Sequence, residues 1–221
     1  MNTPPNDSCH TFSKGKVFKK VTIFTLMRGI GDKNILERFA EEFARIVEKH
    51  CTYIIVSGFV AIAHGRTRAT EDIDMIIEKI PKEKFKALHE DLLEAGFECM
   101  QSSIIEVIYG DYLSKGVSVR YTWKDKFLPE MELKFAKDAL DDLQLRTREK
   151  LPFTGVDVYF SSIEMNIAFK EEYLGSQKDL EDAKHLRMIY QGKINEEEIL
   201  HIKKVIKELR YNHGARKRTP G

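Results

Sequence analysis

The segment from Ile54 to Ile77, IIVSGFVAIAHGRTRATEDIDMII, most constrains how this chain of 221 residues can fold. The run Tyr53–Val56 is apolar and β-branched, which predicts a buried strand. A Ser-Gly pair ends that strand, and the apolar residues 59–64 then predict a short helix. A second β-branched run follows at 73–77 and carries acidic residues. Strand, turn, helix and strand in close succession indicate a core that mixes helices with a sheet.

The Ser-Gly turn is a candidate phosphate site. Backbone N–H groups at such a turn, together with the start of the next helix, favour an anion. Gly58 presents no Cβ, so a phosphate can approach its backbone closely. Many turns between a strand and a helix carry a glycine, so this feature needs support from its neighbours.

Asp72 and Asp74 give that support. Residues two apart on a strand face the same side, about 7 Å from one another. Their neighbours are apolar, so the two carboxylates would leave a core strand together, repel each other and lose hydration. A divalent cation relieves both problems, and oxygen ligands with a triphosphate favour Mg²⁺ or Mn²⁺. The alternatives are a solvated strand end or pairing with Arg66 and Arg68.

This segment resembles the signature of the DNA polymerase β-type nucleotidyltransferase superfamily, and it is most similar to the minimal, AbiEii-like branch. That branch is typified by the string GG-x-A-xx-x-HG-x-x-R-x-T-x-D-I-D. The matching positions are Ser57, Gly58, Ala61, His64, Gly65, Arg68, Thr70, Asp72 and Asp74. A fainter likeness extends to about residue 190.

The resemblance implies further site residues. The family places a third carboxylate between hydrophobic residues on a neighbouring strand. Glu132 fits this pattern. Glu130, which would point to the same face of the strand, is the second choice. Lys170 fits a later helical lysine of the AbiEii-like proteins. The segment SQKDLED at 176–182 fits their R-x-K-D-x-x-D string, with Ser176 in place of Arg, and includes Asp179.

The activity that the resemblance implies is nucleotidyl transfer from an NTP with release of pyrophosphate. Asp72, Asp74 and Glu132 would be the catalytic, metal-binding residues. The expected nucleotide-binding residues are Ser57, Gly58, Arg66, Arg68, Lys170 and Asp179. The acceptor would be RNA or a protein hydroxyl, and AbiEii-like relatives are often toxins, which implies a small antitoxin partner.

Interpretations without a catalytic or binding role stay open for several of these residues. Arg66 would form an ion pair with Glu71, Lys170 would be a solvated helical lysine, and Asp179 would only favour the start of a helix. His64 is expected to be structural.

Three departures from the family pattern, at Ser57, Glu132 and Ser176, suggest as the main alternative a degenerate protein that binds nucleotide or RNA without transfer. Adenylylation of a small hydroxyl compound is a third interpretation, although no clear acidic pocket for a cationic acceptor is evident.

The amino-acid composition limits the remaining classes of protein. Lys and Arg number 36 and Asp and Glu 35, so the net charge of +1 excludes a general polyanion binder. No apolar run reaches the roughly 18 residues of a membrane span. The first twenty residues lack the apolar core of a secretory signal, and the three separated cysteines form no CxxC pair. We therefore expect a cytoplasmic protein without membrane contacts.

The order of the elements predicts an α+β core followed by a helical C-terminal region. The resemblance implies that this core has the nucleotidyltransferase fold, a small mixed sheet flanked by helices. The expected parts are a flexible tail at 1–20, a core at 21–160, C-terminal helices at 161–212 and a basic tail at 213–221. A short strand is expected within 17–26. The basic C-terminal end is expected to be solvated and disordered, with contact to RNA phosphates as the alternative. Tyr121 and Trp123 are expected to pack in the core rather than to stack on bases.

Overall fold

The computed structural model describes residues 33–67 and 72–216. The contacts divide the chain into a unit Met1–Asn34 and a unit Ile35–Gly221, and the elements described below belong to the second. The predicted tail at 1–20, the predicted strand within 17–26 and the end of the predicted basic tail, 217–221, lie outside the described residues. No helix in the described part combines the length and the apolar character of a membrane span.

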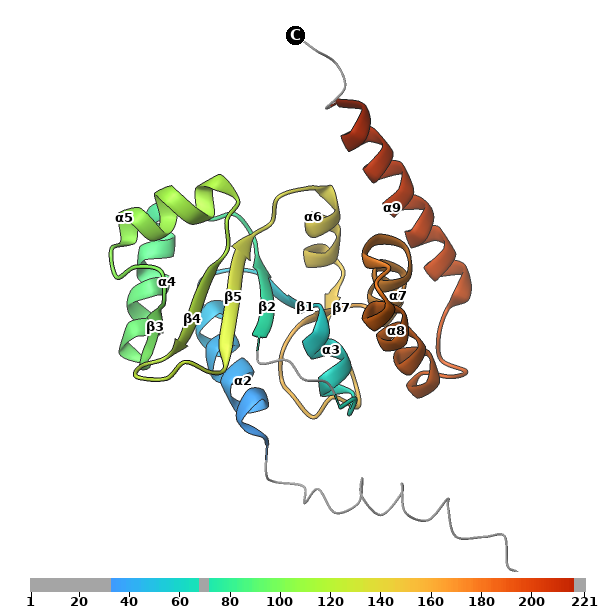
Figure 1. Ribbon diagram of the computed structural model, residues 1–221, viewed down its shortest axis with the longest axis horizontal. Coiled ribbons are helices and arrows are strands. Elements are labelled where there is room, and N and C mark those ends of the chain that lie inside the picture. The colour runs from blue at the N-terminus through green and yellow to red at the C-terminus, as the bar shows by residue number, and fades with distance from the viewer. Residues whose placement is uncertain (1–32, 68–71, 217–221) are drawn as a thin grey trace, which may run out of the picture. The chain divides into compact units, whose positions relative to one another are not determined.

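A seven-stranded mixed sheet, with strand order β3-β4-β5-β2-β1-β7-β6, forms the centre of the second unit (Figure 1). Strand β2 pairs antiparallel with β1 and parallel with β5, and β1 pairs parallel with β7. The strands are β1 Tyr53–Val56, β2 Asp72–Ile77, β3 Phe97–Cys99, β4 Val119–Trp123, β5 Glu130–Phe135, β6 Arg148–Glu149 and β7 Phe160–Ser161. This sheet confirms the predicted fold class.

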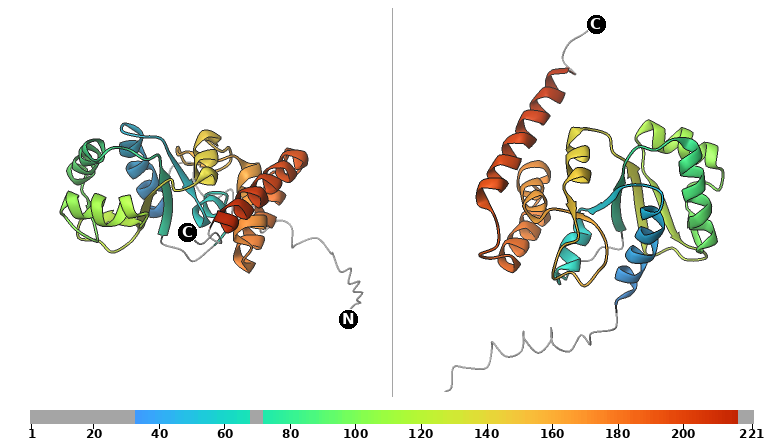
Figure 2. Two further views of the ribbon diagram at one scale, coloured as in Figure 1. Left: turned by 90° about the horizontal axis from the view of Figure 1, so that it is seen from above. Right: turned by 180° about the vertical axis from the view of Figure 1, so that it is seen from behind.

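Helices cover the sheet and continue beyond it. The α-helices are α2 Ile35–Glu48, α3 Gly58–Ala63, α4 Lys82–Glu94, α5 Ile105–Val107, α6 Ala139–Arg146, α7 Ile163–Ala168, α8 Gln177–Ile189 and α9 Glu196–Arg216. Two π-helical segments, η1 Ile108–Tyr112 and η3 Phe169–Leu174, and the 3₁₀ turn η2 Leu113–Lys115 extend α5 and α7. Figure 2 shows α9 beside α7 and α8. The expected helical C-terminal region is present and runs to Arg216.

One face of the sheet packs on the main core. Helix α2 repeats its apolar residues at three- and four-residue spacing, which produces the buried stripe that faces the strands. Phe39 and Phe43 of this helix both contact Phe97, and Phe39 also packs edge-on against Trp123. Tyr121 is fully buried in the same cluster. Tyr121 and Trp123 therefore pack in the core, as predicted.

The opposite face carries the polar residues of the central strands. Side chains alternate along a strand, and paired residues on neighbouring strands point the same way. The pairing aligns Arg120, Glu132, Asp74 and Val56 in one row across β4, β5, β2 and β1. Helix α6 covers part of this face, where its Leu145 packs with apolar residues of β1 and β2.

Some local predictions are wrong. The mainly polar sequence of 136–142 predicts no helix, yet α6 begins at Ala139 because the Asp138 carboxylate accepts two backbone N–H groups and caps the helix. The sequence VDVYF at 156–160 predicts a strand, but only Phe160–Ser161 forms one. The sequence SSIE at 161–164 predicts a helix cap at Ser161, but the cap is Ser162, whose hydroxyl accepts from the Met165 N–H.

Candidate active site

The turn after β1 holds its serine in an unusual backbone conformation. Ser57 has φ 65° and ψ −133°, a region that glycine enters readily and other residues rarely. Such a conformation costs of the order of 1–3 kcal/mol and persists only when the surroundings hold it. Ser57 stands where the AbiEii-like string has a glycine, and the turn keeps the geometry that suits glycine.

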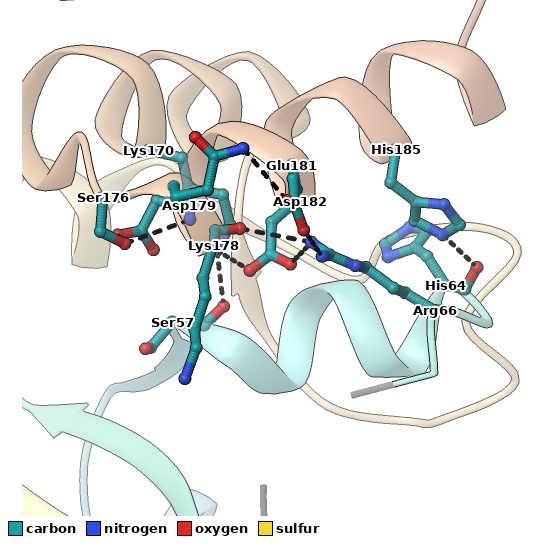
Figure 3. Close-up of polar contacts among 11 residues, drawn as sticks. Ser57, His64, Arg66, Lys170, Ser176, Lys178, Asp179, Glu181, Asp182 and His185 are labelled. Carbon is teal, nitrogen blue, oxygen red and sulfur yellow. Dashed lines mark hydrogen bonds and ion pairs between the residues drawn. The ribbon is translucent and has the colours of Figure 1, made fainter. Parts of the chain in front are cut away.

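Two contacts hold this turn. The Ser57 carbonyl accepts a hydrogen bond of 3.0 Å from Lys170 Nζ, which reaches it from the π-helical segment η3 (Figure 3). The Ser57 side chain lies beside the Asp74 carboxylate and lowers its pKa. The turn is thus tied to the C-terminal helices on one side and to the acidic strand β2 on the other.

The parallel pairing of β2 and β5 brings the predicted carboxylates together at the level of the backbone. Asp74 lies beside Glu132, and Asp72 lies beside Glu130. Neighbouring strands are about 4.8 Å apart, so the charges of this group repel one another. Burial raises the pKa of Asp74 above its ordinary value of 3.8, and the charges of Glu132 and Asp72 add to this, although the hydrogen bond from Ser57 acts against them.

The side chains of β5 face a cation from β4. Arg120 lies 3.5 Å from the Glu130 carboxylate and 3.4 Å from that of Glu132, and the Ser118 hydroxyl donates to Glu132 at 2.8 Å. The two glutamates raise the pKa of Arg120. Arg120 therefore offsets part of the negative charge in the position where a divalent cation would do so.

The acidic group fits a divalent cation in charge, in oxygen chemistry and in strand register. Across residues 33–67 and 72–216, however, no three His, Cys, Asp or Glu side chains converge closely enough to hold a metal ion. Glu130 and Glu132 turn toward Arg120 instead. Metal binding would therefore have to exchange the ion pair of Glu132 with Arg120 for a metal–oxygen contact.

We expect the substitution Arg120→Met to strengthen Mn²⁺ binding. The variant removes the competing cation but keeps a long apolar stem, so Glu132 is released toward Asp74. The gain should be about three- to fivefold in affinity, because a half-exposed ion pair contributes up to about 1 kcal/mol. Titration of the metal-free protein with Mn²⁺ measures this, and Lys115→Met, at the exposed ion pair of Lys115 with Asp111, is the control. Weaker binding in Arg120→Met would contradict this explanation.

Lys170, Asp182 and Arg66 form a buried charge network next to the turn (Figure 3). Lys170 is 2% exposed and Asp182 is fully buried, and Lys170 Nζ lies 3.0 Å from Asp182 Oδ2. Arg66 also contacts Asp182 and reaches Glu181 at 2.6 Å. Lys170 is thus not a solvated lysine, and Arg66 is engaged with α8. Both residues hold protein groups, and their expected role in nucleotide binding remains a prediction.

The other expected residues have local roles in this structure. Asp179 exchanges hydrogen bonds with Ser176 at the start of α8, so it takes part in the cap of that helix. The His64 ring is buried between the Val60 carbonyl and the Tyr190 hydroxyl, 2.7 and 2.8 Å away, which confirms a structural histidine. Arg68 lies outside the described residues, as does the expected pairing partner of Arg66, Glu71.

Two features of the site are absent from the sequence prediction. Arg120 precedes Tyr121 in the sequence with no motif around it, and only the pairing of β4 with β5 shows that it faces Glu132. Helix α6 was not predicted at all, so its residues Asp141 and Gln144 were not considered. Both line a pocket next to Ser57 and Asp74. The available signal was the three-residue spacing of Leu140 and Leu143 after Asp138, a residue type that commonly caps helices.

Comparison with solved structures shows what this fold resembles. The solution structure of the antibiotic-resistance factor ANT(2'')-Ia matches with a TM-score of 0.51 and 15% identity, over 82% of this chain and 95% of that one. Its crystal structure in complex with adenylyl-2''-tobramycin matches with a TM-score of 0.46 and 17% identity, over 80% and 98% of the two chains. An antigenic nucleotidyltransferase-like protein from Paracoccidioides brasiliensis gives 0.46 and 18%, over 81% and 90%.

The first of these similarities establishes that the chain has a nucleotidyltransferase fold. The likeness concerns the fold alone, because the identity is low. No protein-family model matches the sequence. No curated protein matches it either.

Proposed function

We propose that this protein is a metal-dependent nucleotidyltransferase that moves a nucleoside monophosphate from an NTP to an acceptor hydroxyl. The observation that carries the proposal is the strand register, which sets Asp74 of β2 beside Glu132 of β5 and next to the Ser57 turn. Two carboxylates on a core strand lower the stability of the fold unless a positive charge compensates them. A divalent cation bound to a triphosphate is the ligand that suits such a pair best.

The roles proposed for the residues follow from their positions. Asp72 and Asp74 would hold Mg²⁺ or Mn²⁺, and Glu132 would complete the ligands on the side of the attacking hydroxyl and help to remove its proton. Ser57 and Gly58 would seat the β- and γ-phosphates through their backbone. The bound cation would offset the charge of the triphosphate. Lys170 would act on the phosphates through the Ser57 carbonyl that it holds.

Two kinds of acceptor are considered. The AbiEii-like sequence resemblance favours an RNA end or a protein hydroxyl, and a toxin role with a small antitoxin partner rests on that resemblance alone. The fold similarity to ANT(2'')-Ia favours a small hydroxyl compound as the second candidate.

The deciding experiment offers each α-³²P-labelled NTP with Mg²⁺ to the full chain, together with total RNA, a protein extract or a set of aminoglycosides. Label that moves to one acceptor class establishes the activity and selects the acceptor. Magnesium-dependent NTP binding by calorimetry without any labelled product would instead support the degenerate, binding-only alternative. Absence of both binding and transfer would overturn the proposal.

We expect Glu132→Gln to lose more transfer activity than Glu130→Gln. Glu132 lies beside Asp74, whereas Glu130 lies beside the outer Asp72. Groups that only support metal ligands cost about 10- to 100-fold when removed, so a ligand itself should cost at least about 100-fold. Initial rates of label transfer compare the two variants, which are matched because both lose one contact with Arg120. The reverse order would move the third carboxylate to Glu130.

A further inference from the structure

A pocket of about 110 Å³ opens beside the Ser57 turn on the same face of the sheet as Asp74. Its walls come from the ends of β1 and β2, from α6, and from α7 with η3. Apolar side chains form most of the surface, and they are Val56, Ile76, Phe169 and Leu174. The polar groups are Ser57 and Asp74 at one side, with Lys170, Asp141, Gln144 and Asn166.

Gln144 is the lining residue of this pocket whose hydrogen bonding is incomplete. Its side chain is 3% exposed, and its Oε1 accepts a hydrogen bond of 3.1 Å from the Ser161 hydroxyl. Its Nε2, in contrast, is buried without a hydrogen-bond partner among the described residues. A buried N–H donor left without a partner costs about 1–3 kcal/mol, so this group is expected to meet an acceptor when a ligand is present.

Asp141 offers a complementary acceptor on the same helix. It is buried, and one carboxylate oxygen accepts from the Lys137 backbone N–H at 3.0 Å. A buried amide donor and a buried carboxylate, set in mostly apolar walls that include the Phe169 ring, match a flat heteroaromatic ring with hydrogen-bonding atoms on its edge. A nucleobase has this chemistry.

The position of the pocket indicates which part of the reaction it would serve. Along the row of paired residues, Glu132 lies on the β5 side of Asp74, and Val56, which lines the pocket, lies on the β1 side. The proposed acceptor side is that of Glu132. The pocket therefore lies on the other side, next to the turn proposed to hold the phosphates.

We propose that this pocket takes the base of the donor NTP and that Gln144 Nε2 donates a hydrogen bond to its edge, so that Gln144 is a specificity-determining residue. This inference rests on the proposed function, because it places the triphosphate at the Ser57 turn. The inference adds a site that recognises the base, and this site lies on α6. None of the residues in the sequence motifs belongs to that helix.

The test compares each NTP with inorganic tripolyphosphate, which has no base. Calorimetric titration of the full chain with Mn²⁺ gives both dissociation constants, and their ratio measures what the base contributes. We expect at least one NTP to bind about tenfold more tightly than tripolyphosphate. In Gln144→Leu that ratio should fall about five- to tenfold, the effect of one lost hydrogen bond, with tripolyphosphate affinity unchanged.

Ser161→Ala is the matched control, because it removes the hydrogen bond of the same amide to β7 but leaves Nε2 in place. Its ratio should equal that of the native protein. An equal fall in both variants would assign Gln144 a structural role only and overturn the inference. Gln144→Glu, which keeps the shape and removes the donor, gives the same comparison if Gln144→Leu unfolds.

The two proposals fail differently. Binding of tripolyphosphate and of all NTPs with equal affinity would overturn the base pocket but leave the phosphate site intact. Absence of binding by both kinds of probe in the presence of Mn²⁺ would overturn the proposed function, and with it the base pocket.

Discussion

Replacement of Asp74 by Asn is expected to abolish transfer and to weaken Mn²⁺ binding by at least about 100-fold. The change removes one charge and almost no volume from the residue that lies between the Ser57 turn and Glu132. Titration with Mn²⁺ and the rate of label transfer measure the two effects. Asp142→Asn, the same change at an exposed position of α6, should leave both unchanged.

The same variant should be more stable than the native protein when metal is removed. Burial, with Glu132 and Asp72, raises the pKa of Asp74, so the folded chain binds this proton more tightly than the unfolded chain does. Stability from this group is therefore present below the ordinary pKa of 3.8 and is lost as the pH rises through the raised value. At neutral pH the uncharged amide avoids that loss.

Thermal unfolding in EDTA at pH 7 tests this expectation. Asp74→Asn should unfold at a higher temperature than the native protein and should gain nothing from added Mn²⁺, whereas the native protein should gain stability with metal. A variant that unfolds at a lower temperature and still binds Mn²⁺ normally would refute both the electrostatic description and the metal assignment.

The second large effect is expected at the buried pair of Lys170 and Asp182. Lys170→Met should lower the free energy of unfolding by about 3 kcal/mol, the lower end of the range for a broken buried ion pair, because Arg66 still contacts Asp182. The melting temperature should then fall by about 6–12 °C. Lys184→Met, at an exposed lysine of α8, should change it little.

A double variant isolates the interaction energy between Lys170 and Asp182 from the effects of the surrounding residues. Lys170→Met with Asp182→Leu removes both buried charges, so it should recover part of the loss, and the two effects should not add. Denaturant unfolding of the four proteins gives this coupling. Strict additivity would show that the 3.0 Å contact between Lys170 and Asp182 contributes nothing to stability.

Local patterns in the sequence were sufficient for most of the fold. The period of two around Asp72 and Asp74, and the helical spacing in α2, each depend on near neighbours in the chain, and both are present in the structure. Helix α6 was missed because its apolar stripe is short and its start depends on a cap at Asp138. Strands β3 and β6, of three and two residues, are too short to produce a pattern.

The site was harder to predict because its contacts join distant segments. The choice of Glu132 came from a family pattern, and the pairing of β2 with β5 then set it beside Asp74. Nothing local to Arg120 reveals that it faces two glutamates, and nothing local to Lys170 reveals that it holds a carbonyl 113 positions earlier. These contacts depend on tertiary packing, which no short motif encodes.

The link from Lys170 to the Ser57 carbonyl has a consequence for how the protein is made. During translation the first strands emerge well before residues 170–182, so a nascent chain contains the acidic strand and the glycine-like bend without the group that holds that bend. The bend at Ser57 is therefore held in place only after residues 170–182 have joined the fold.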